Sequence, residues 1–373
     1  MGRETTIDSI QALDKRIEEV TAELIQLKRA RNSSLTVARV PPEILGYIFR
    51  FNITTEVGGD PQFAGIQHGS YNFLLVCHHW FEVARRLPEL WSFWGNSLED
   101  WKRQLPLSGT APLDLVLDGT ECQVGSFGET MLDALKDYTT RNAVRKIHLR
   151  SDDIQLLTTI VSALTPDGWF SCDSNIESIA LNGVDVTGLL SRRSYPKLRS
   201  LSLSGRFSLY SDYQGFLERN ITTLVNLSLS SNALSSIQAA SQILSLLTSN
   251  PNIRTLALES LNVKDDIRYG HKKPRVPLRH LKKLSLTGDF YYFFPILQQL
   301  ELPERVDHAR LEFSDCSSGD VEDAIVPYIR DYFRRDPRFE ERLGIFFSHT
   351  ENRVSLRASA IGVGYHGPDR LPQ

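Results

Sequence analysis

The sequence Leu224-Val-Asn-Leu-Ser-Leu-Ser-Ser-Asn232 is the clearest indication of how this chain folds. Its second and third leucines alternate with polar residues, which is the pattern of a β-strand that buries one face. The same apolar spacing, L-x-x-L-x-L, recurs on both sides of this stretch. It is filled at Ile176/Ile179/Leu181, Leu198/Leu201/Leu203, Ile253/Leu256/Leu258 and Leu281/Leu284/Leu286. Five fits along one chain indicate an internal repeat.

The distance between the repeats favours a leucine-rich-repeat solenoid. Including an earlier apolar run at Ile147, the strand positions 147, 179, 201, 227, 256 and 284 are separated by 32, 22, 26, 29 and 28 residues. Most of these steps fall within the range of about 20 to 29 that is typical of leucine-rich repeats, whose units each hold a strand and a helix or turn. Residues 236–249 have apolar residues at helical spacing and predict one such helix. Only one repeat ends in the template asparagine, Asn232, so the predicted solenoid is irregular.

We expect this α/β solenoid to extend from residue 107 to residue 350, with residues 351–373 forming the end of its cap and a tail. Beyond Leu311 the repeat gives way to a helical pattern at 321–333 and to strand patterns at 344–347 and 354–357. A solenoid needs an atypical terminal unit to cover its last open core face. The C-terminal region is therefore predicted to be that cap.

Strand alternation also predicts which side chains face outward. If Leu201 and Leu203 point into the core, their polar neighbours lie on the opposite, concave face of the sheet. This face is the candidate surface for a protein substrate. Its predicted members are Ser200, Ser202, Asn226, Ser228, Thr255, Glu259, Lys283 and Ser285.

The N-terminal residues 1–31 predict a long amphipathic helix. Apolar residues step by three and four, as in the a/d seam of a coiled coil, at Ile10, Leu13, Ile17, Val20, Leu24 and Leu27. The seam covers nearly three heptads, which is marginal for a free-standing coiled coil. Two interpretations stay open: a homodimer through residues 10–27, or a single helix whose stripe packs on the next module.

A second helical region spans residues 38–94. Pro41-Pro42 precedes an amphipathic helix predicted at 43–51, since proline suits a first helical turn. Residues 52–72 are polar and glycine-rich and predict a long loop. Helical periodicity then returns from Phe73 to Ala84, and Leu87-Pro-Glu-Leu-Trp91 marks a break.

The order of these pieces resembles the F-box, a helical motif of roughly 45 residues. The resemblance rests on Val40-Pro-Pro-Glu-Ile-Leu45, Ile48-Phe49, Leu75-Val-Cys-His-His-Trp80 and Leu90-Trp91. It implies docking on a Skp-type adaptor, which bridges to a cullin-RING ubiquitin ligase. The residues that would contact the adaptor, or shape the small core behind the contact, are Pro42, Ile44, Leu45, Ile48, Val76, Cys77, Trp80 and Trp91. The loop 52–72 is longer than is usual in this family, whereas the irregular repeats resemble those of the expanded fungal F-box families.

Composition excludes several other classes of function. The net charge of -3 gives no basic field for nucleic acid, and no apolar stretch is long enough to span a membrane. The four cysteines lack metal-binding or disulfide-framework spacing, which favours an intracellular compartment, cytoplasmic or nuclear. No cofactor-binding or catalytic motif occurs, and Cys77-His78-His79 cannot converge on one metal ion because consecutive helical residues point 100° apart.

The sequence thus predicts a multidomain, non-enzymatic protein: an α-helical coiled-coil and F-box module followed by a leucine-rich-repeat-like α/β solenoid. Its expected function is to hold a substrate for ubiquitination. One alternative is a repeat-based interaction scaffold with no ubiquitin role. The other is an enzyme with an unmarked site, which would need convergent titratable groups in a concave pocket.

Overall fold

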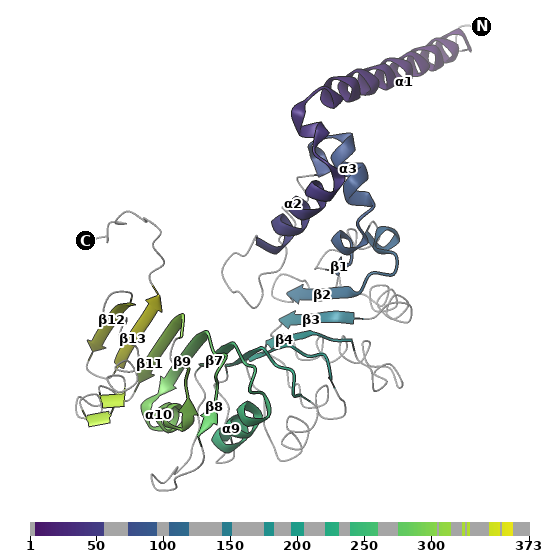
Figure 1. The fold of residues 1–373 in the computed structure, drawn as a ribbon. Helices are drawn as coiled ribbons and strands as arrows, with labels where there is room; N and C mark the ends of the chain where they lie inside the picture. The colour runs from purple at the N-terminus through teal and green to yellow at the C-terminus, as the bar shows by residue number, and fades with distance from the viewer. Residues whose placement is uncertain are drawn as a thin grey trace, which may run out of the picture. The chain divides into compact units, whose positions relative to one another are not determined.

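The chain forms two compact units, residues Met1–Pro112 and Leu113–Gln373. The structure is a computed structural model (Figure 1). It describes residues 4–55, 74–94, 104–118, 144–150, 175–182, 195–204, 221–230, 239–259, 275–303, 306–314, 323–324, 327–328, 343–350 and 353–360.

The first unit is helical where it is described. The long helix α1 (Glu4–Ser33) is followed by the short 3-10 helix η1 (Thr36–Arg39) and by α2 (Pro42–Thr55). After the gap come α3 (His78–Arg85), the 3-10 turn η3 (Pro88–Leu90) and a two-residue strand, β1 (Phe93–Trp94). Helix α2 begins at Pro42, one residue before the predicted 43–51, and there the missing N–H of proline costs no helical hydrogen bond.

Two predicted boundaries in this unit were wrong. Residues 52–55 continue α2 instead of opening a loop, and residues 56–73 lie outside the described part. The second helix begins only at His78, not at Phe73, because the backbone of Cys77 is extended, with φ -163° and ψ 167°. Residues 74–75 form a separate 3-10 turn.

The small core of this unit lies between α2, α3 and η3. Its buried members are Leu45, Phe49, Val83, Ala84, Leu90 and Trp91. The indole nitrogen of Trp91 donates to the carbonyl oxygen of Ala84 at 2.8 Å, so the buried polar end of this side chain is satisfied. A compact three-element core therefore holds α2 in place.

The second unit is built on one mixed sheet (Figure 1). Its strands lie in the order β2 (Leu113–Asp118), β3 (Val144–Arg150), β4 (Ser178–Asn182), β5 (Ser200–Ser204), β6 (Asn226–Ser230), β7 (Thr255–Glu259), β9 (Lys283–Asp289), β11 (His308–Ser314), β13 (Arg353–Ala360) and β12 (Leu343–Thr350). All pairs from β2 to β11 are parallel and, apart from one shift between β2 and β3, keep a constant register. An unbroken run of parallel neighbours in sequence order is a repeat solenoid, as the sequence predicted.

The register lines up the template leucines in rows. Ile179 faces Leu201, Leu201 faces Leu227, and the row continues through Leu256 and Leu284. All of these side chains are buried. The helices α9 (Ala239–Ser249) and α10 (Phe290–Gln299) lie on the same side of the sheet in Figure 1 and bury their own apolar residues. The predicted helix at 236–249 is thus confirmed over its described residues.

The four repeats that begin at Leu198, Leu224, Ile253 and Leu281 each have a further buried residue that the template does not contain. It lies three positions before the first template residue, and its carbonyl oxygen accepts a hydrogen bond from that residue at Leu198, Ile253 and Leu281. These extra positions are Tyr195, Ile221, Asn250 and Leu278, all fully buried. They turn the chain into each strand and extend the core along the turn.

The C-terminal end of the sheet changes direction. Strand β13 pairs antiparallel with β11, and β12 pairs antiparallel with β13. This hairpin ends the parallel run, so the two strands predicted in the cap are confirmed. The helix predicted at 321–333 falls largely outside the described residues. A separate small sheet pairs β8 (Val276–Pro277) with β10 (Leu300–Glu301) in parallel.

Candidate functional site

Helix α2 has two apolar faces, and only one of them is used by the core. Leu45 and Phe49 are completely buried. Four other apolar side chains recur at spacings of three, one and three residues, which places them together on the opposite face. They are Ile44 (49% exposed), Tyr47 (68%), Ile48 (43%) and Phe51 (69%), and we call them the α2 outer face.

The residues predicted to bind an adaptor therefore fall into three groups. Pro42, Ile44, Ile48 and Val76 are exposed, as is Leu75 beside Val76. Cys77 and Trp80 are half-buried, and Leu45 and Trp91 are core residues. Tyr47, Phe51 and Leu75 were missed, although the helical spacing from Ile44 was a signal that would have found the first two.

Side-chain contacts fix the orientation of α2. The ring of Phe49 packs edge-on against Trp80, with centroids 5.5 Å apart. The indole nitrogen of Trp80 donates to the carbonyl oxygen of Val37 at 3.1 Å, which ties α3 to η1. At the far end of α2, Arg50 forms an ion pair with Glu89. The outer face is thus presented by a helix that α3 and η3 hold through Phe49 and Arg50.

The second candidate surface is the outward face of the parallel sheet. The constant register forms rows of side chains across it, and the middle row is made of small residues: Ala180, Ser202, Ser228, Ala257 and Ser285. Ser228, Ala257 and Ser285 are half-buried, whereas Ala180 and Ser202 are buried, so only the β6–β9 part of this row, which we call the floor, is open to solvent. Charged residues lie at both ends of this floor.

Most of the predicted substrate-face residues do face outward. Asn226 and Lys283 are exposed, whereas Ser200, Ser228, Thr255, Glu259 and Ser285 are half-buried. The prediction that Ser202 is exposed was wrong, because its side chain is only 7% exposed. In the middle row it lies beside Ala180, which is buried as well.

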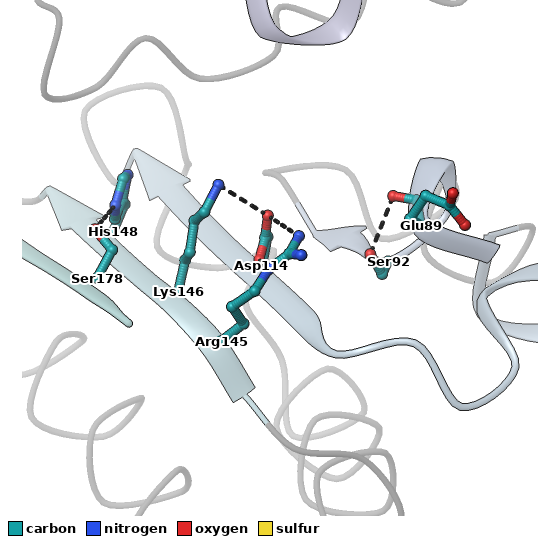
Figure 2. Close-up of polar contacts among 7 residues, drawn as sticks. All are labelled: Glu89, Ser92, Asp114, Arg145, Lys146, His148 and Ser178. Atoms are coloured by element: carbon teal, nitrogen blue, oxygen red, sulfur yellow. Dashed lines mark hydrogen bonds and ion pairs between the residues drawn. The ribbon is translucent and has the colours of Figure 1, made fainter. Parts of the chain in front are cut away.

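A polar cluster occupies the β2–β4 end of this face (Figure 2). Asp114 accepts from Arg145 Nε and Nη2, both at 2.8 Å, and forms an ion pair with Lys146 at 3.3 Å. The register of β2 and β3 shifts between Leu113 and Asp114, which leaves Arg145 as the extra residue of a bulge. The bulge brings two basic residues to one carboxylate.

His148 belongs to the same cluster. Its Nε2 atom lies 2.9 Å from the hydroxyl oxygen of Ser178 on the next strand, as Figure 2 shows. Burial, and then the positive charge of Lys146, lower the pKa of His148 to about 4, against a smaller opposing effect of Asp114. The ring is therefore neutral at neutral pH, and one of its nitrogens accepts or donates within the pair depending on the tautomer.

The Ser178–His148 pair differs from a nucleophile activated by a histidine base. In such sites a carboxylate orients the second ring nitrogen. Here both oxygens of Asp114 bond to Arg145, with Lys146 beside one of them, and no carboxylate bonds to the His148 ring among the described residues. A pKa of about 4 also makes the ring a weak base. The cluster is better suited to binding than to acyl transfer.

An ion pair occupies the other end of the face. Arg310 on β11 donates to both carboxylate oxygens of Glu312, at 2.9 and 3.0 Å. Glu312 is almost fully buried, whereas Arg310 is about half exposed. The hydrogen bonds to Glu312 raise the pKa of Arg310 despite partial burial. The floor of small residues thus lies between two sets of fixed charges.

The described residues give no sign of a metal or membrane site. They contain no group of three His, Cys, Asp or Glu side chains that could hold a metal ion. No helix within the described ranges combines the length and apolar character of a bilayer-crossing segment. No protein-family model matches the chain, and no curated protein matches it.

Proposed function

We propose that this chain is the substrate-recognition subunit of a Skp-cullin-F-box type ubiquitin ligase. In this proposal the α2 outer face docks a Skp-type adaptor, and the outward face of the repeat sheet, in a leucine-rich-repeat domain, holds the target protein. The protein would act as an intracellular tether that raises the local concentration of the target near a ubiquitin-charged enzyme. The catalytic chemistry would belong to its partners.

The observation that carries the proposal is the pair of apolar faces on α2. A small helical unit in isolation rarely leaves a contiguous set of large apolar side chains exposed, and such patches mark interaction sites. Ile44, Tyr47, Ile48 and Phe51 form such a set, while Leu45 and Phe49 already supply the core of the unit. Aromatic and aliphatic anchors of this kind are typical of interface hot spots.

The sheet face supports the second half of the proposal. Its floor of small residues is flanked by the Asp114–Arg145 pair and the Arg310–Glu312 pair. Fixed charges around a partly exposed floor provide electrostatic complementarity, which contributes specificity more than raw affinity. A protein segment with charged ends is the kind of target that such a face fits.

The test uses the full chain co-expressed with a Skp-type adaptor. Ile44→Glu/Ile48→Glu places two charges on the outer face without touching the core, and glutamate is a good helix former. We expect the wild type to co-elute with the adaptor, and we expect the double variant to lose at least about a hundredfold in affinity, since two hot-spot residues are lost.

Leu35→Glu is the matched control. Leu35 is an exposed apolar residue of the same unit, 45% exposed, but lies outside the α2 outer face. This variant should bind the adaptor as the wild type does. If the wild type, although folded, shows no adaptor binding, the ubiquitin-ligase role is wrong and a repeat scaffold without that role becomes the better account.

A further inference from the structure

Helix α1 carries a second exposed apolar surface, separate from the α2 outer face. Its a/d residues Ile10, Leu13, Ile17, Val20, Leu24 and Leu27 are 48% to 63% exposed. The stripe therefore does not pack on the rest of the described first unit, which was one of the two interpretations of the sequence. Helical stability in proteins comes mostly from packing of an amphipathic face, so this stripe calls for a partner.

We propose that α1 pairs with α1 of a second copy of this chain, as an antiparallel two-stranded coiled coil. This inference is independent of the adaptor proposal. In an antiparallel pair centred on the seam, each a residue meets a d residue of the other copy. The layers are then Ile10 with Leu27, Leu13 with Leu24, and Ile17 with Val20, each occurring twice. Every layer is apolar and branched, with no buried polar residue or charge.

The charge distribution decides the orientation. Residues 4–23 carry six acidic and two basic side chains, whereas residues 24–33 carry three basic and no acidic ones. A parallel pair would set like-charged halves side by side, while an antiparallel pair sets each acidic half against a basic half. At the positions flanking the seam, Arg16 of one copy then meets Glu23 of the other, twice by symmetry, whereas a parallel pair would set Glu23 beside Lys28. The orientations therefore differ in the net charge of the facing halves and not in the number of opposite-charge flank pairs.

Arg16 is already positioned on this flank. Its Nη1 atom lies 3.0 Å from Glu19 on the same helix, and the Arg16 side chain remains 70% exposed. An exposed ion pair of this kind holds the side chain only weakly. The guanidinium group is therefore able to exchange or share partners with a carboxylate of the second copy.

The seam has enough area for a weak but specific pair. Twelve half-exposed Ile, Leu and Val side chains, six from each copy, bury on the order of 1,000 Å², close to the lower bound of specific interfaces. A membrane surface fits α1 less well, because helices that lie on membranes usually have a polar face rich in Lys and Arg, whereas this one carries six acidic residues in its first twenty. The second copy is the occupant that both the seam and the charges suit.

Sedimentation equilibrium of the full chain tests the proposal. We expect a concentration-dependent species of twice 42.3 kDa at micromolar protein. Ile17→Glu/Val20→Glu, in the central layers, should give only the monomer. Ile25→Glu is the matched control, since Ile25 is 45% exposed but lies outside the seam, and it should leave the dimer intact. Circular dichroism of each variant checks that the repeat domain remains folded.

A charge exchange tests the orientation. Arg16→Glu sets two like-charged pairs in the antiparallel dimer and should weaken it about three- to tenfold. Arg16→Glu/Glu23→Arg restores both pairs in that orientation and should recover the affinity. In a parallel dimer the Glu23→Arg substitution would instead set an arginine beside Lys28 of the other copy and weaken pairing further. A wild-type chain that stays at 42.3 kDa over the whole concentration range overturns the dimer. A charge exchange that fails to restore pairing overturns the antiparallel orientation.

Discussion

The Oδ1 atom of Asn250 accepts a hydrogen bond from the backbone nitrogen of Leu224 at 3.0 Å and thereby joins two neighbouring repeats. The Nδ2 atom of the same side chain donates to the carbonyl oxygens of Ile221, at 2.8 Å, and Leu246, at 2.9 Å. Asn250 is 0% exposed, so this amide satisfies three backbone groups that water does not reach. It connects the end of α9 to the turn that leads into β6.

Asn250→Leu should therefore destabilise the repeat unit. Leucine has a similar volume but cannot bond, and each backbone group left buried and unsatisfied costs about 1–3 kcal/mol. Allowing for relaxation, we expect a loss of about 2–4 kcal/mol in the free energy of unfolding, measured by urea denaturation. Asn252→Ala, at an exposed position two residues away, is the control and should change the free energy by less than about 0.5 kcal/mol.

Gly288→Ala should also be costly. Gly288 has φ +156°, which L-residues rarely adopt, and a Cβ atom there would collide with the ring of Phe293. Phe293 is fully buried in α10, so its ring has no free space to enter. Backbone strain and overpacking together should lower the free energy of unfolding by about 2–4 kcal/mol, which thermal or urea unfolding can measure. Gly109→Ala is a useful comparison, because Gly109 also has a strained φ, +55°, but no atom lies within 4 Å of the Cβ that alanine would add. A stability loss as large as that of Gly288→Ala would contradict the role of the Phe293 contact.

Adjacent residues of α2 should behave in opposite ways. Leu45→Ala creates a cavity in the core of the first unit and should lower the free energy of unfolding by about 2–5 kcal/mol. Tryptophan fluorescence can monitor this unfolding, since Trp91 lies in the same core. Ile44→Ala removes an exposed side chain and should change stability by less than about 0.5 kcal/mol. Under the proposed function, Ile44→Ala nevertheless weakens adaptor binding. Equal stability losses from the two variants would show that α2 does not present two distinct faces.

The stability of the repeat unit should fall as the pH is lowered from 6.5 towards 4. The pKa of His148 is about 4 in the folded chain, against 6.5 in the unfolded chain. Between these values the unfolded state binds a proton that the folded state does not, so the free energy of unfolding decreases with decreasing pH, by at most about 3 kcal/mol. The measurement is urea unfolding at several pH values.

His148→Gln should remove much of this pH dependence, since glutamine does not titrate and can still bond to the Ser178 hydroxyl. His280→Gln, at an exposed turn position, is the control and should leave the slope unchanged. An unaltered slope in the His148 variant would mean that this ring does not remain neutral in the folded protein.

The repeat architecture could be predicted from the amino-acid sequence. Alternation of leucines with small polar residues specifies a strand with one buried face, and five such runs at similar spacing specify parallel neighbours, because each unit can bury its leucines only against the next one. The start of α2 at Pro42 and the helix at 239–249 followed from equally local rules, namely proline at the first helical turn and apolar residues at helical spacing. The apolar stripe on α1 could also be predicted from the sequence, but the partner that covers it could not.

The folded structure was needed to show which of the expected site residues lie on the surface and which lie in the core. Ile44, Leu45 and Ile48 are all apolar residues of one helix, and the packing of α3 and η3 buries Leu45 alone among them. Long-range polar contacts also became known only from the folded structure. Asn250 bonds to residues 26 and 29 positions away in sequence, and a bulge brings Arg145 to Asp114 across 31 residues. Periodicity in the sequence predicts on which face of a helix or strand a residue lies. It does not predict which face is buried or which distant polar groups bond to each other, because these depend on contacts that form only when the chain folds.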